Sequence, residues 1–150
     1  MYVQALKELG LRKTDKILHD CLFFTANSIA RKITKMAENE FRFTGLAPSQ
    51  AFILMLVYEN PGIGPKLLCE YLNLAPSTVT RFADTLKYKG YITKEVMGKN
   101  ISISITDEGA KLYDKIAEAW TNLYLRYSEI LGEQEGIKLT KNIDWANQLL

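Results

Sequence analysis

Hydroxyl and guanidinium side chains occur at helical spacing in the segment 75–86. Pro76 suits the first position of a helix, where a missing N–H costs little. Apolar residues on one side would anchor this helix to a core: Val79, Phe82, Ala83 and Leu86. The other side would carry the outward residues near the helix N-terminus: Ser77, Thr78, Thr80 and Arg81. Such groups suit phosphates and guanine edges, so the segment predicts a DNA-reading helix, although an ordinary surface helix has the same residue types.

The segments before this helix have the order of a helix-turn-helix. Residues 46–59 and 66–72 are expected to be helices, because the run Asn60-Pro61-Gly62-Ile63-Gly64 between them is rich in helix breakers. The short step Asn73-Leu74-Ala75 then leads into the candidate reading helix.

Two strands are expected after Gly90, over residues 91–96 and 101–106. In the second strand Ile101, Ile103 and Ile105 fall on one face, and hydroxyl residues fall on the other. Met97-Gly98-Lys99-Asn100 would connect the strands. A helix-turn-helix followed by a β-hairpin is a winged helix, so we expect a mainly α fold with a small hairpin wing (α+β).

Four short motifs resemble successive signatures of the MarR family of bacterial and archaeal transcriptional regulators. They are Leu46-Ala47-Pro48-Ser49-Gln50, Ser77-Thr78-Val79-Thr80-Arg81, Lys87-Tyr88-Lys89-Gly90-Tyr91-Ile92 and Ile105-Thr106-Asp107-Glu108-Gly109. The resemblance implies a homodimer of winged helices that binds pseudo-palindromic double-stranded DNA, here predicted to be a repressor. In this family a small molecule or an oxidant often releases the DNA.

The wing departs from the family pattern, in which a longer tip carries arginines. Here the connection has no arginine, and Lys99 occupies about the position of a family wing arginine. Lysine fits a narrow minor groove less well than a guanidinium does, so we expect Lys99 to contact phosphate. The short wing leaves open an alternative function, in which the winged unit acts mainly through protein partners and DNA binding is weak or accessory.

Long apolar helices flank the winged unit, which we place at 46–106 within a single domain of residues 1–150. One continuous helix is expected over 14–40, and another from an N-cap at Thr106 to about residue 131, where Gly132 ends it before a last helix. The helices at 14–40 and 107–150 carry more apolar surface than one small core needs. A second copy of the chain is the expected partner, and folding back on its own core is the alternative.

Composition agrees with one DNA-binding domain. The chain has 150 residues, is 47% hydrophobic and has a formal charge of +2. Within residues 62–106 there are six Lys or Arg and three Asp or Glu, which gives +3 and leaves −1 elsewhere; Lys87 is a further candidate DNA contact. The longest apolar run, 51–58, is far shorter than the roughly 20 residues of a membrane helix, and we expect a cytoplasmic protein without a membrane partner.

Catalysis has little support in the sequence. His19 is the only histidine, which excludes a metal site with several imidazoles. No Cys-x-x-Cys motif, glycine-rich phosphate loop or paired-carboxylate motif is present. We therefore predict no catalytic residue, metal or cofactor, and no enzymatic activity.

The sensed signal is less clear from the sequence. The family resemblance implies an aromatic or phenolic effector, and Tyr113, Trp120 and Tyr124 could line its cleft, although an aromatic stripe is more often core. Some MarR-like proteins detect peroxide through a cysteine in the first helix. Alignment on Ser28-Ile29-Ala30-Arg31 places Phe23 at that position, and Cys21 lies two residues earlier. Two residues rotate a helical side chain by about 200°, so we expect Cys21 to be structural.

Overall fold

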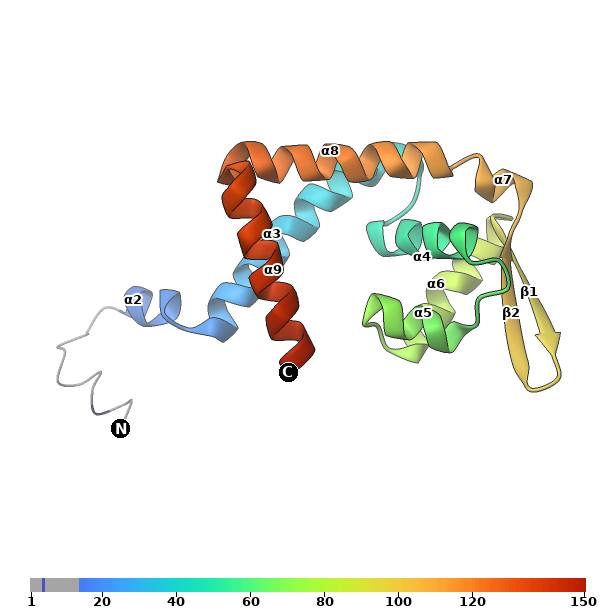
Figure 1. Cartoon of the computed structure of the whole chain (residues 1–150), viewed down its shortest axis with the longest axis horizontal. Coiled ribbons are helices and arrows are strands. Elements are labelled where there is room, and N and C mark those ends of the chain that lie inside the picture. The colour runs from blue at the N-terminus through green and yellow to red at the C-terminus, as the bar shows by residue number, and fades with distance from the viewer. Residues whose placement is uncertain (1–3, 5–13) are drawn as a thin grey trace. The chain divides into compact units, whose positions relative to one another are not determined.

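The structure, a computed structural model, describes residue 4 and residues 14–150. Its contacts divide the chain into two units, Met1–Ala37 and Glu38–Leu150. The described part of the first unit contains α2 (Thr14–His19) and most of α3 (Leu22–Phe41) (Figure 1). The second unit contains all the elements of the predicted winged helix.

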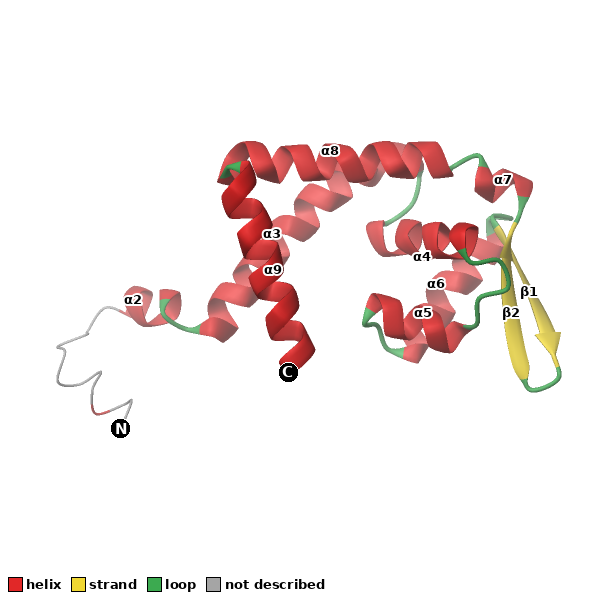
Figure 2. Ribbon diagram, in the orientation of Figure 1, coloured by secondary structure: helices red, strands yellow, loops and turns green. Residues whose placement is uncertain are grey.

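The second unit follows the predicted order of elements, with the hairpin beside a group of helices (Figure 2). Its elements are η1 (Arg42–Thr44), α4 (Pro48–Glu59), α5 (Pro65–Leu72), α6 (Pro76–Tyr88), β1 (Ile92–Met97), β2 (Asn100–Ile105), α7 (Asp107–Ala110), α8 (Tyr113–Leu131) and α9 (Glu133–Leu149). Each of α4, α5 and α6 has a proline at its start, where the missing N–H has no helical partner to lose. Asn73 ends α5 in a left-handed conformation, which sets the turn into α6.

The hairpin pairs Ile92 with Ile105 and Met97 with Asn100. The turn is therefore only Gly98-Lys99, shorter than the four-residue connection expected from the sequence, because Met97 and Asn100 join the strands. Gly98 has φ +64°, which a two-residue turn of this kind needs at its first central position. The predicted alternation of β2 is confirmed, since Ile103 is fully buried while Ser102 and Ser104 lie on the other face.

A single apolar core joins the helices to the hairpin. Ile103 contributes to it from β2. In the loop before α5, the Ile63 carbonyl accepts the Ile103 N–H at 3.0 Å, and the Gly62 N–H donates to the Ile103 carbonyl at 2.9 Å. Ile116 and Ala119 bring the first part of α8 into the same core. Other fully buried members are Phe41, Ile53, Leu54, Val57, Leu68, Val79 and Leu86. The packing of α6 against this core fixes the position of its outward face.

Both long helices predicted outside the winged unit are interrupted. The helix expected over 14–40 breaks at Asp20 and Cys21, two residues of low helix propensity. The helix expected from residue 107 to about 131 breaks between α7 and α8, so that prediction was also wrong. The N-cap at Thr106 is confirmed, because its hydroxyl accepts the Gly109 N–H at 3.1 Å, and Gly132 ends α8 with φ +84°. Within the described residues, no helix is both long and apolar enough to cross a membrane.

Candidate nucleic-acid interface

The helix α6 has one buried side and one exposed side, as its sequence predicts. Val79, Ala83 and Leu86 are essentially fully buried, and Phe82 is half-buried. On the opposite side Ser77, Thr80 and Arg81 are exposed within the first turns of the helix. Thr78 lies at the margin and is half-buried, so it belongs less to the outward face than the other three.

A shallow hollow follows the outward face of α6. It is lined by Ser77, Thr80, Arg81, Asp84, Thr85 and Tyr88. The Arg81 guanidinium carbon lies 5.2 Å from the centroid of the Phe82 ring, within the range of a cation–π contact. This contact steadies the guanidinium at the surface, where it can reach a guanine edge or a phosphate.

The lysines of the winged unit have different environments. Lys87 is exposed near the end of α6. Lys89 instead donates to the Gly45 carbonyl at 3.0 Å and so holds the end of η1. Lys94 from β1 forms an ion pair with Asp84 of α6, and only 16% of its side chain is exposed. Lys89 and Lys94 are therefore engaged within the protein, which the count of charges along the sequence does not reveal.

A second hollow lies between the start of α5 and the wing. Its lining includes Lys66 from α5 and Lys99, Asn100 and Ile101 from the wing. Among the described residues that line it, none is acidic. Lys66 and Lys99 are suited to contact the phosphate backbone of one DNA strand. This agrees with the expected role of Lys99.

The tip of the wing is more apolar than we expected. Val96 is 80% exposed and Met97 63% exposed, and Ile101 lies opposite Val96 in the hairpin. The sequence analysis did not predict this surface. Side chains alternate between the two faces of a strand, so Val96 and Ile101 lie on one face of the hairpin, at the end that extends past the core. Apolar side chains near one lysine can lie against deoxyribose or against another protein.

The three aromatic residues proposed for an effector cleft lie along α8 but have different partners. Tyr113 stacks on Tyr58 with ring centroids 4.3 Å apart, and its hydroxyl donates to Glu59 at 2.9 Å. The hydrogen bond to Glu59 raises the pKa of Tyr113, because ionisation would remove the donated proton and would also place two negative charges together. Trp120 packs against Phe52 with centroids 4.9 Å apart.

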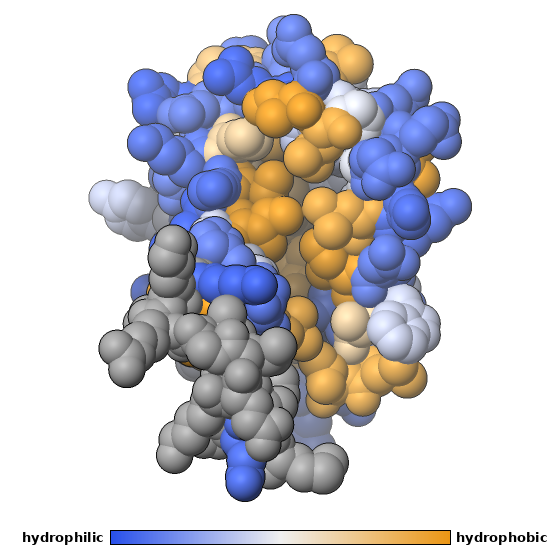
Figure 3. Space-filling model, turned by 90° about the vertical axis from the view of Figure 1, so that its left-hand side faces the viewer, coloured by the Kyte–Doolittle hydropathy of each residue, from blue (hydrophilic) through white to orange (hydrophobic). Residues whose placement is uncertain are grey.

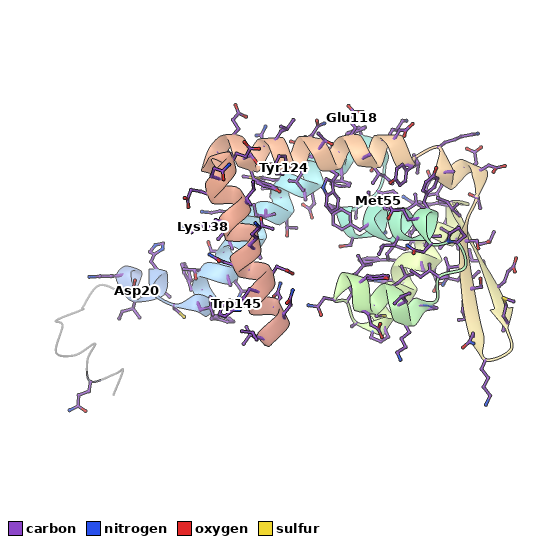
Figure 4. The ribbon with its side chains drawn as sticks, in the orientation of Figure 1. Asp20, Met55, Glu118, Tyr124, Lys138 and Trp145 are labelled. Atoms are coloured by element: carbon purple, nitrogen blue, oxygen red, sulfur yellow. The ribbon has the colours of Figure 1, made fainter. Side chains whose placement is uncertain are left out.

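Tyr124 lies further along α8 than α4 reaches (Figure 4) and donates to Glu133 at 3.1 Å. The structure therefore does not gather Tyr113, Trp120 and Tyr124 into one cluster. Glu118 projects from the side of α8 that faces away from α4 (Figure 4).

The sequence model of the MarR family matches residues 46–96, which include α4, α5, α6 and most of β1. The predicted resemblance of the winged unit to the MarR family is confirmed. It is 24% identical over 128 residues to the HTH-type transcriptional repressor MdtR of Bacillus subtilis (strain 168), with 83% of this chain and 82% of that protein covered.

Solved structures of MarR-type proteins have the same fold. The repressor CouR bound to a 23-mer DNA duplex matches with a TM-score of 0.78 and 17% identity, over 87% of this chain and 94% of that one. CouR from Rhodococcus jostii RHA1 bound to p-coumaroyl-CoA matches with a TM-score of 0.72 and 20% identity, over 84% and 91%. The predicted winged fold is confirmed by these structures.

The match to the MarR family model and the similarity to a transcriptional repressor support the expectation that the chain is not an enzyme. In the described part of the chain, no group of three or more His, Cys, Asp or Glu side chains is placed to hold a metal ion.

Cys21 occupies a different position from the one expected. It immediately precedes α3, and its carbonyl accepts the Thr25 N–H at 2.9 Å, which makes it the N-cap of that helix. The prediction that it lies inside a helix was wrong. The rotation expected for two positions along one helix therefore does not apply to Cys21.

We expect organic hydroperoxide to leave DNA binding by this protein unchanged, because Phe23 stands at the position where the resemblance would place a sensing cysteine. The measurement is a DNA titration of wild type and Cys21→Ser, each with and without stoichiometric hydroperoxide. Release of the wild type alone would identify Cys21 as a redox sensor and contradict the expectation. Cys69, half-buried on α5, provides a second thiol for a matched Cys69→Ser control.

Proposed function

We propose that this protein is a homodimeric transcriptional repressor that binds a pseudo-palindromic operator in double-stranded DNA. The observation that carries the proposal is the two-sided helix α6: Val79 and Leu86 are fixed in the core, and Ser77, Thr80 and Arg81 face outward from its first turns. Hydroxyl and guanidinium groups in this place suit the major groove. Residues 46–106 would form the DNA-binding unit in each protomer. The protein would act in the cytoplasm, where bacterial and archaeal DNA is located.

Exposed apolar surface on the terminal helices supports the dimer. Large side chains on α8 and α9 are more than half exposed: Leu125, Ile130, Trp145 and Leu149. The face shown in Figure 3 carries extensive hydrophobic surface. A monomer would leave this surface in water, whereas an identical copy could cover it by two-fold symmetry. The helices at 14–40 and 107–150 are the proposed dimerisation elements.

The dimer predicts a particle of twice the 17.1 kDa chain mass at micromolar concentration, because apolar helix faces of this kind are rarely left in water. Light scattering coupled to gel filtration measures that mass directly. A homogeneous particle of the monomer mass would contradict the proposal, since a monomer cannot place two copies of α6 one helical turn apart on DNA.

An aromatic or phenolic effector remains part of the proposal. The structure of CouR with p-coumaroyl-CoA supports small-molecule binding by a protein of this fold. In this chain Trp120 and Tyr113 offer ring surface beside α4, and Tyr124 a hydroxyl further along α8, so an effector would contact these residues separately or after a rearrangement of α8.

Selection of DNA from a random pool by the purified protein tests the proposed function. We expect an enriched pseudo-palindrome whose half-sites are centred about 10 base pairs apart. If no sequence is enriched, the proposal of a sequence-specific regulator is wrong.

The exposed apolar wing favours a second candidate function, in which the winged unit acts mainly through a protein partner. Val96, Met97 and Ile101 would provide the contact surface, and DNA binding would be weak or accessory. A failed DNA selection, together with unchanged folding after Val96→Ser, would favour this candidate.

A further inference from the structure

The outward face of α6 carries a negative charge where the proposed DNA would lie. Asp84 lines the same hollow as Ser77, Thr80 and Arg81, and among the described residues around that hollow it is the one acid. It lies three residues after Arg81 and seven after Ser77, so the three side chains share one stripe of the helix. Its side chain is 62% exposed. An acid in this position repels phosphate, and its presence needs a reason.

Lys94 offsets the negative charge of Asp84. It reaches from β1 to Oδ1 of Asp84, and its own side chain is mostly buried at 16% exposure. A covered cation beside the carboxylate offsets its charge without competing for DNA phosphates. The contact also fixes the direction of the carboxylate, which keeps most of its surface open toward the hollow. The pair therefore presents an oriented hydrogen-bond acceptor with little net charge.

We propose that Asp84 is a specificity-determining residue, which selects an amino group at one point of the major groove, and that Lys94 is its positioning residue. This inference rests on the proposed function. An ionised carboxylate accepts hydrogen bonds and donates none. Cytosine N4 and adenine N6 are the amino groups in the major groove, whereas guanine O6 and thymine O4 are acceptors that face a carboxylate unfavourably. Asp84 thus selects cytosine or adenine at its position in each half-site.

The two members of the ion pair should then respond in opposite ways to substitution. Asp84→Ala removes the acid, so discrimination at one base pair of each half-site should fall by about fivefold or more, the lower range for a base contact. The same change leaves Lys94 with an unpaired charge, so affinity for random DNA should rise by about two- to tenfold at low salt. Lys94→Met leaves Asp84 unpaired and no longer oriented, so affinity for all DNA should fall and the preference for cytosine or adenine should weaken.

The experiment measures Kd by fluorescence anisotropy for the DNA that wild type selects, for every single base-pair variant of one half-site, and for random DNA. Glu95→Ala is the matched charge control, because Glu95 is an exposed acid next to Lys94 whose side chain points to the other face of β1. It should leave every base preference unchanged. Asp84→Asn, which adds a donor, should shift the preference toward adenine.

Each outcome has a distinct meaning. If Asp84→Ala and Lys94→Met weaken DNA binding alike and change no base preference, the pair is only a structural tie between β1 and α6, and the inference is wrong. If wild type selects a sequence but Asp84→Ala retains all its base preferences, the proposed function stands and the inference fails. If wild type selects no sequence, the proposed function fails and the inference fails with it.

Discussion

Gly109→Ala is expected to lower the free energy of unfolding by about 3 kcal/mol, the upper end of typical overpacking costs. A Cβ at this position would lie 2.1 Å from the Tyr91 carbonyl oxygen and 2.9 Å from Cγ1 of Ile105. The carbonyl cannot move freely, because it accepts the Thr106 N–H at 3.0 Å where the hairpin leads into α7. The gain in helix propensity from alanine, about 1 kcal/mol, is too small to offset the clash.

Chemical denaturation followed by circular dichroism measures this change. Gly136→Ala is the matched control, since Gly136 is also a buried helical glycine but its nearest neighbour, the Tyr127 ring, would be 3.7 Å from the new Cβ. The control should be as stable as wild type, or more stable by up to about 1 kcal/mol. Equal stability of the two variants would show that α7 does not pack closely against Tyr91.

Arg81→Ala is expected to cost about 1–3 kcal/mol of DNA-binding free energy for each half-site, and twice that for a dimer with both sites engaged. The loss should be largest for the selected sequence, and specificity should relax at one base of each half-site. The reason is that Arg81 is exposed on α6 within the hollow, steadied by Phe82, where its guanidinium can form two hydrogen bonds with guanine.

Lys99→Ala is the comparison for Arg81→Ala, because Lys99 lies in the two-residue wing turn beside the second hollow. It should weaken all sequences similarly and reduce the slope of log K against log salt by about one for each lost phosphate contact. Titrations of both variants at several salt concentrations separate the two roles. Sequence-independent losses in both would show that Arg81 only positions the protein, and no loss in either would favour the protein-partner function.

The sequence was sufficient to predict the parts of the fold that depend on short-range patterns. The start of α6 follows from Pro76 and its buried side from a period of 3.6, both within a dozen residues. The alternation of isoleucines in β2 and the N-cap at Thr106 are likewise local. These features place Ser77, Thr80 and Arg81 at the surface without any knowledge of the tertiary structure.

The features that the sequence did not predict depend on contacts between distant segments. The close approach of Gly109, in α7, to the Tyr91 carbonyl joins positions eighteen residues apart. The pairing of Lys94 with Asp84, and of Lys89 with the Gly45 carbonyl, depends on how α6 meets β1 and η1. Charge counting along the chain treats these lysines alike, so it could not separate the cations that remain available for DNA from those held within the protein.

Methylation interference on the selected DNA tests most directly whether two copies of α6 enter the major groove. Dimethyl sulfate modifies guanine N7 in the major groove and adenine N3 in the minor groove, so a single reagent reports on both. We predict that N7 methylation blocks binding at guanines in both half-sites, with the two positions about 10 base pairs apart. Binding that tolerates N7 methylation throughout the selected sequence would contradict the assignment of α6 as the DNA-reading helix.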